Sequence, residues 1–209
     1  MEFFPLTFSF LCLFLISPSE SKCMNGDDES SFVHELISRI VSEGPKEIRL
    51  PRRLLGNVYL KRGFIYGLNT LRLSEEPVLL FCHNQTLGAI QPKLVLDNVT
   101  FLYEWVYGDE ESHGIATTPS QKMSIDIDIE QSEDIGRPSM LGLYITKITN
   151  TKFNVVINSN KENLDVFDQE YQVALAGRTF IARDARLAMN MEISPRVANF
   201  LFNSRLSVG

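Results

Sequence analysis

The hydrophobic residues of this 209-residue chain change their spacing once along its length. From about residue 51 to residue 157 they recur mainly at every second position, and residues 123–130 alternate without a break. After residue 163 they recur at intervals of three and four. A period of two is typical of strands with one buried face, and a period near 3.6 is typical of helices. The sequence therefore predicts an α+β fold, in which an antiparallel sheet precedes a long C-terminal helix.

Residues 94–107 form the longest strand candidate, and two independent features predict which of its faces points inward. Most of its large apolar side chains occupy odd-numbered positions. Asn98, on the other face, begins an N-x-Thr glycosylation motif, and a glycan requires that face to point outward. The odd face consists of Val95, Asp97, Val99, Phe101, Tyr103, Trp105 and Tyr107, and of these Val99, Phe101, Tyr103 and Trp105 are predicted to point inward.

The remaining β segments are predicted from shorter patterns. Gly63 and Gly67 interrupt a strand candidate at residues 57–73 and predict bulges or close backbone approach in a bent sheet. Residues 84–88 predict a turn, and the polar stretch 108–122 predicts an exposed connection.

Two amphipathic helices flank the predicted sheet. Acidic residues and serines open the first at residues 27–31, and Gly44-Pro45 ends it. The C-terminal helix is apolar over more than one face, so the curved sheet is predicted to wrap around it. Ser194-Pro195 predicts either the start of a second helix or a kinked continuation. The remaining surface of this helix is assigned to Arg178, Arg183, Asp184 and Arg186.

Composition excludes several classes of protein. The formal net charge of −6 argues against a nucleic-acid partner or an anionic membrane held by bulk electrostatics. Three cysteines and three histidines are too few for a disulfide-dense scaffold or a module with several zinc ions. The hydrophobic share of 44% is sufficient for an ordinary globular core.

Residues 1–21 predict a secretory signal peptide. The apolar run that begins at Phe3 is shorter than the about 20 residues that cross a bilayer, and small residues follow it up to Ser21. Residues 22–209 are then expected to form one secreted, extracellular domain. Asn84 and Asn98 are predicted glycosylation sites. Cys23 and Cys82 remain after cleavage, either as a disulfide or as two free thiols.

No recognised catalytic motif, cofactor loop or metal-ligand pattern is present in the sequence. Asp126, Asp128 and Glu130 share one strand face, which is more typical of a solvated surface than of a metal site. Cys82 and His83 are neighbours on a strand, so their side chains point to opposite faces and do not form a nucleophile–base pair. We therefore expect no catalytic residue, no metal and no cofactor.

The stretch from Gly63 to Arg72 resembles the G-x-I-x-G-L-x-T-[IL]-x-R motif of arthropod proteins similar to group-seven mite allergens. The likeness continues through 83–86, 94–98, 103–105, 125–130 and the C-terminal segment that contains Pro195, and it spans about residues 31–206. That family resembles one half of bactericidal/permeability-increasing protein, in which a curved sheet wraps a long helix. The resemblance implies secretion and the binding of a lipid between sheet and helix, without catalysis.

The favoured function is therefore a secreted, non-enzymatic carrier or sensor of a lipid or other hydrophobic small molecule. The alternative is an extracellular protein-interaction module with a filled core, whose protein partner the sequence does not identify. Neither nucleic-acid binding nor stable membrane insertion is expected. The apolar cavity of the carrier is predicted to be lined by Val99, Phe101, Tyr103, Trp105, Ile125, Ile127, Leu143, Phe180 and Ile181.

Overall fold

The computed structural model describes residues 26–83, 86–108, 112–132, 137–159 and 166–204. Within these residues, two α-helices and one 3-10 helix accompany a sheet of eleven antiparallel strands, and the predicted α+β architecture is confirmed. The elements in chain order are α1 (Gly26–Glu43), β1 (Glu47–Leu50), β2 (Arg53–Leu55), β3 (Val58–Tyr66), η1 (Leu68–Thr70), β4 (Leu71–Leu73), β5 (Val78–His83), β6 (Thr86–Gln91), β7 (Lys93–Tyr107), β8 (Ser112–Thr117), β9 (Gln121–Ser132), β10 (Pro138–Ile148), β11 (Asn154–Ser159) and α2 (Val166–Asn203).

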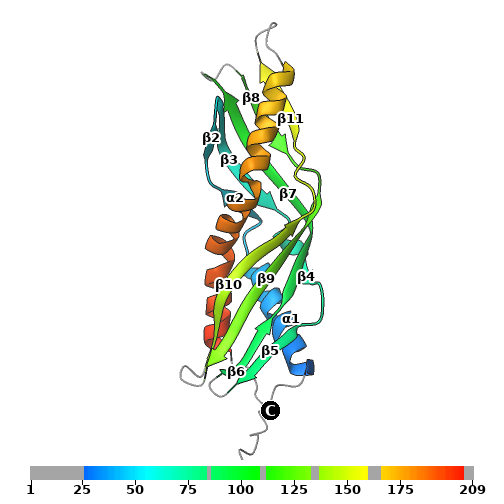
Figure 1. The fold of residues 1–209 in the computed structure, drawn as a ribbon, viewed down its shortest axis with the longest axis vertical. Helices are drawn as coiled ribbons and strands as arrows, with labels where there is room; N and C mark the ends of the chain where they lie inside the picture. Colours follow the sequence, from blue (N-terminus) through cyan, green and yellow to red (C-terminus); the bar gives the residue numbers. More distant parts are fainter. Residues whose placement is uncertain (1–25, 84–85, 109–111, 133–136, 160–165, 205–209) are drawn as a thin grey trace, which may run out of the picture.

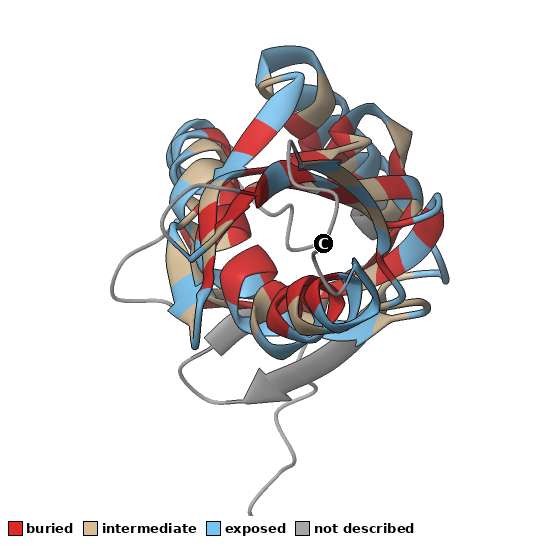
Figure 2. Cartoon of the chain, turned by 90° about the horizontal axis from the view of Figure 1, so that it is seen from above, coloured by how far each residue is buried: buried red, intermediate tan, exposed pale blue. Residues whose placement is uncertain are grey.

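The sheet curves around the long axis of an elongated molecule without closing on itself. Its main path runs β1-β3-β7-β9-β6-β5, with β10 beside β9, β8 beside β7 and β11 beside β8. The helix α2 extends along most of the length of the molecule (Figure 1), and strands and helices together encircle the axis (Figure 2). One hydrophobic core joins the inner face of the sheet to both helices. One edge of β10 pairs with β9, and its other edge packs along α2.

The strand β7 changes its inward parity at a bulge. Its ladder with β9 shifts register between Leu96 and Val99, so one extra residue lies in β7. Asp97 and Asn98 at this bulge are not buried. The prediction that Val99, Phe101, Tyr103 and Trp105 point inward is confirmed, while the odd positions before the bulge, Val95 and Asp97, lie outside the core cluster. The inward residues on the two sides of the bulge are Leu94 and Leu96, then Val99, Phe101, Tyr103 and Trp105.

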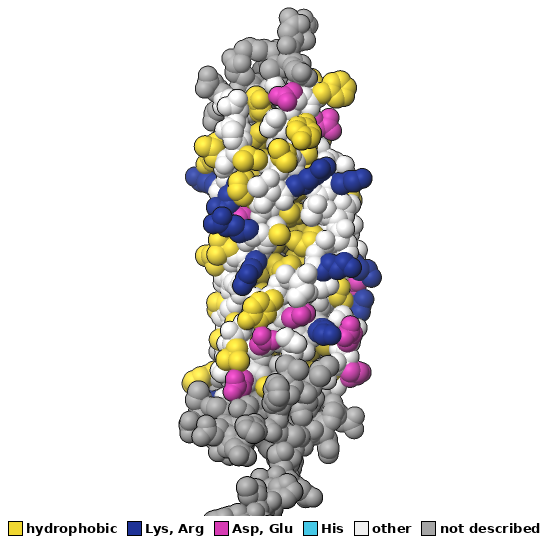
Figure 3. Space-filling view, in the orientation of Figure 1, with side chains coloured by type: hydrophobic (Ala, Val, Ile, Leu, Met, Phe, Trp, Pro, Cys, Tyr) yellow, Lys and Arg dark blue, Asp and Glu magenta, His cyan; other side chains and the backbone are white. Residues whose placement is uncertain are grey.

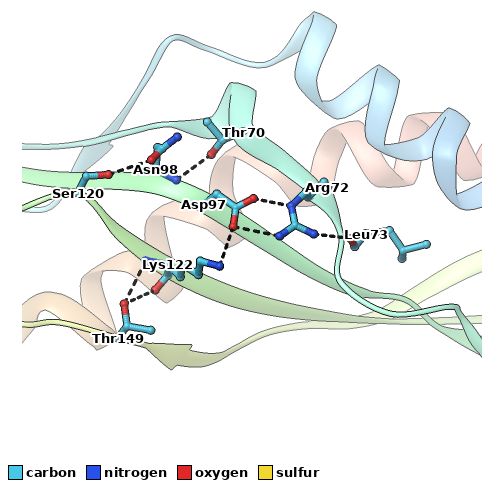
Figure 4. A network of polar contacts seen from close by, with 8 residues as sticks. All are labelled: Thr70, Arg72, Leu73, Asp97, Asn98, Ser120, Lys122 and Thr149. Atoms are coloured by element: carbon cyan, nitrogen blue, oxygen red, sulfur yellow. Dashed lines mark hydrogen bonds and ion pairs between the residues drawn. The ribbon is translucent and has the colours of Figure 1, made fainter.

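A polar network on the outer face fixes this bulge (Figure 4). Arg72 on β4 pairs with Asp97, and Lys122 on β9 lies 3.4 Å from the same carboxylate. The hydrogen bonds from Arg72 hold the pKa of Asp97 below its ordinary value. The backbone N–H of Asn98 donates to Thr70 Oγ1 at 3.2 Å. The network therefore joins three strands at the point where the alternation of β7 breaks.

Gly63 and Gly67 lie where other segments approach the backbone closely. A Cβ on Gly63 would lie 2.5 Å from the Tyr103 ring. Gly67 has a φ of 106° and adjoins the Asn98 carbonyl, so a side chain there would meet both strain and a clash. The prediction of close approach is confirmed, while the bulge in β3 lies at Lys61, two residues before Gly63.

Two predicted connections contain strands instead. Residues 112–117, expected in an exposed connection, form β8 between β7 and β11. Gly114 faces Trp105 there, and a Cβ would clash with the backbone of Val156, so bulkier strand-forming residues do not fit. Thr86–Gln91 forms β6, so the predicted turn at residues 84–88 is too long. Small residues in both segments have a low strand propensity, so the sequence did not indicate these strands. Packing against the neighbouring strands favours them instead.

The helix α1 occupies the predicted segment and packs its apolar side on the end of α2. The rings of Phe32 and Phe200 lie 5.2 Å apart, and Leu36 and Ile40 are fully buried. The helix α2 continues through Pro195, so of the two alternatives predicted at Ser194-Pro195 the structure has the continuation and not a separate second helix. Pro195 is exposed, and water can replace the N–H donor that the Met191 carbonyl lacks.

Candidate functional site

The nine residues predicted to line a ligand cavity all belong to the hydrophobic core or pack against it. Eight of them, all except Phe180, are at most 2% exposed, and Phe180 is half-buried beneath the Arg53 guanidinium. On α2, Ala185 faces the interior and Ala182 faces solvent. That these residues contact a ligand stays a prediction. The set is Val99, Phe101, Tyr103, Trp105, Ile125, Ile127, Leu143, Phe180 and Ile181.

Buried residues on α2 recur at every fourth position along the whole helix. Four residues advance about 40° beyond one full turn of an α-helix, so this row winds around the helix axis. The helix thus presents one side to the core near its beginning and another side near its end. The row consists of Gln169, Val173, Gly177, Ile181, Ala185, Met189, Ile193, Val197 and Leu201.

The winding of this row leaves an apolar strip exposed on the second half of α2. Met191 is 69% exposed and Phe202 is 64% exposed, although both are large apolar residues. The available signal was that the helix is apolar over more than one face, but the sequence did not show that part of this apolar surface faces solvent. The strip comprises Leu187, Met191, Pro195, Ala198 and Phe202.

A groove of about 810 Å³ lies between this strip and the first residues of β10. Its walls are mainly apolar, and the polar groups are confined to a few positions. The Arg137 guanidinium lies 4.4 Å from the centre of the Phe202 ring, which holds this cation at the rim. Figure 3 shows that hydrophobic side chains follow the seam between helix and sheet along this face. The lining residues are Arg137, Pro138, Ser139, Met140, Ser194, Pro195, Ala198, Leu201 and Phe202.

A buried ionic cluster joins the middle of α2 to the sheet. Asp184 is fully buried and accepts two hydrogen bonds from Arg53, at 2.8 and 2.6 Å, and one from the Tyr103 hydroxyl at 3.2 Å. The hydrogen bonds to Asp184 raise the pKa of Arg53, and burial raises the pKa of Tyr103. The prediction that Asp184 lies on the helix surface is wrong. Its partners Arg53 and Tyr103 are far away in the sequence, so the sequence alone did not indicate this buried cluster.

The other predicted site residues lie on the outer surface or outside the described residues. Asp126, Asp128 and Glu130 are half-buried opposite the buried isoleucines of β9, and Gln91 Nε2 donates to Asp128 at 2.6 Å. Asn98 is exposed. Asn84, Cys23 and the side chain of Cys82 lie outside what the structure describes, as does the predicted signal peptide.

Two comparisons with known proteins bear on this chain. No model of a protein family matches it, and no curated protein sequence matches it. No helix among the described residues is both long and apolar enough to cross a bilayer. The functional inference therefore rests on the groove and its surroundings.

Proposed function

We propose that this chain is a secreted, non-enzymatic carrier or sensor of a lipid or other hydrophobic small molecule, and that the ligand occupies the groove between β10 and α2. The observation that carries the proposal is this apolar groove of about 810 Å³, which lies beside the buried core. Its volume lies within the range of about 300–1,000 Å³ that is typical of small-molecule sites. The resemblance to tubular lipid-binding proteins supports the same class of function.

The chemistry of the groove favours an amphiphile. Met140, Leu201 and Phe202 offer apolar contacts to a hydrocarbon body, from which water is displaced on binding. Arg137 is the one charged residue among the described lining residues, and its place at the rim suits a carboxylate or another hydrogen-bond acceptor. A fatty-acid-like ligand satisfies both regions. Its orientation would be set by the charged rim and its affinity mainly by apolar contact.

Filling the groove is expected to weaken ligand binding without unfolding the protein. Ala198 lines the groove and is exposed, so Ala198→Trp places an indole inside it. We expect the dissociation constant for a fluorescent fatty acid to rise about tenfold or more, because an indole buries about 150–250 Å² of surface that the probe needs. Fluorescence titration of the full secreted protein measures this change.

A matched variant separates groove filling from a general effect on the helix. Ala182→Trp adds the same side chain to an exposed position of α2 that does not line the groove, and it should bind like the wild type. Native mass spectrometry of gently purified protein should show a co-purifying lipid that Ala198→Trp loses. Equal binding by both variants, with no lipid in the wild type, would instead favour the protein-interaction module.

Secretion and glycosylation are proposed together, because an exposed Asn98 acquires a glycan only in the secretory pathway. Protein expressed in a eukaryotic host is expected to begin near Lys22 and to carry a glycan at Asn98. Intact mass spectrometry measures both features. Asn98→Gln should lower the mass by one glycan, while an unprocessed N-terminus and an unmodified Asn98 would contradict secretion.

A further inference from the structure

A second pocket, of about 460 Å³, opens on the outer face of the sheet between β1, β3 and the link that joins β1 to β2. It is separate from the groove and shares none of its lining residues. Four of the seven described lining residues are cationic and none is acidic. They are Arg49, Leu50, Arg52, Lys61, Arg62, Gly63 and Phe64.

The bulge in β3 creates this concentration of charge. Leu60 pairs with Trp105 and Arg62 pairs with Glu104, so Lys61 is an extra residue in the strand. Regular alternation would point one of Lys61 and Arg62 into the core. The bulge instead keeps both cations outside, while Leu60 and Gly63 on either side of them remain buried.

Among the described residues, the three arginines of this pocket find few acidic partners. Arg62 has one loose ion pair, with Glu104 at 3.9 Å, and both side chains are exposed. Arg49 and Arg52 make no ion pair with any residue that the structure describes. The cluster also opposes the formal net charge of −6. Like charges around one pocket repel one another, and a bound anion relieves that repulsion.

We propose that this pocket binds a phosphate ester group. Planar guanidinium groups recognise phosphate oxygens through paired, charge-assisted hydrogen bonds, and three of the four cations are arginines. The pocket volume accommodates a phosphate with a small attached group, either as a free ester or as a phospholipid headgroup. This site goes beyond the proposed carriage of a hydrophobic ligand and does not depend on it.

The experiment uses two phosphate-bearing probes and a pair of matched variants. Glycerol 3-phosphate is titrated into the full secreted chain in chloride buffer and followed by NMR. Phosphatidylcholine vesicles with and without phosphatidate are tested by co-sedimentation. Arg49→Gln/Arg52→Gln is expected to weaken binding at least about tenfold, because it removes both unpaired guanidinium groups. Arg178→Gln/Arg183→Gln removes two exposed arginines of α2 and should bind like the wild type.

The results assign the source of the phosphate or overturn the site. Saturable shifts at the amides of Leu50 and Gly63 with glycerol 3-phosphate identify a free ester, and binding only to phosphatidate vesicles identifies a headgroup. Binding should fall as ionic strength rises from about 0.01 to 0.15 M, where the screening length shortens from about 30 to 8 Å. Binding of neither probe, or an equal loss in both variants, overturns the proposal. Ala198→Trp should leave phosphate binding unchanged, so this result is independent of the groove.

Discussion

Replacing Arg53 with methionine is expected to lower the free energy of unfolding by about 3 kcal/mol or more, with an upper end near 5 kcal/mol. The substitution leaves Asp184 fully buried, with the Tyr103 hydroxyl as its remaining partner among the described residues. A buried charge without its counter-ion is expensive, because water no longer solvates it. The Arg53 side chain is 21% exposed, which favours the lower end of the range. Urea denaturation followed by circular dichroism measures the change.

A triple variant tests whether the loss comes from the stranded charge. Replacing Arg53 with Met, Tyr103 with Phe and Asp184 with Leu removes every polar member of the cluster together. Apolar replacements of buried ion pairs are often neutral or stabilising, so the triple variant should be more stable than Arg53→Met alone. A loss below about 1 kcal/mol in the single variant would mean that Arg53 does not neutralise Asp184.

Ile127→Asp is expected to cost several kcal/mol, enough to unfold a domain of ordinary stability. Ile127 is 1% exposed on β9 and lies opposite Leu143 of β10, so an aspartate there has no charged or polar partner in that cross-strand pair. Burial would raise the pKa of the introduced carboxyl above its unfolded value. The destabilisation should therefore be smallest in acid and grow as the pH rises above about 4, the ordinary pKa of aspartate.

Asp126→Ala, at the neighbouring position, should change stability by no more than about 0.5 kcal/mol. Asp126 is half-buried on the outer face, and burial raises its pKa. The folded protein therefore slightly disfavours the charged form of Asp126, and removing this carboxylate should cost little stability. Thermal unfolding of both variants across pH measures the contrast, and equal losses would contradict the assignment of the two faces of β9.

The regular segments of the fold were predictable because each carries its own periodic signal. The alternation of residues 123–130 predicted β9, and its buried side chains are those of the apolar positions. The spacing after residue 163 predicted α2. In both cases the hydrophobic effect selects one face, so the pattern in the sequence reports directly on burial.

Features that depend on distant partners were not predictable. Asp184 resembles a surface residue of a helix until Arg53, 131 residues away, is brought beside it. The bulges at Lys61 and at Asp97 reverse the alternation of β3 and β7, and only the pairing of the strands reveals them. To predict the groove, one would need to know which side of α2 faces solvent and that the edge of β10 lies beside it. The sequence indicated only that the helix is apolar on more than one side.

The four-residue row on α2 determines how the length of this helix can change during divergence. Deleting one residue would turn every later side chain by about 100° and move Phe202 into the position of the buried Leu201. Inserting four residues would add one step to the row and change the phase by only about 40°. Length changes in related chains should therefore occur in steps of four within α2, or be confined to the turns between strands. The length of α2 would therefore set the length of the sheet that packs around it.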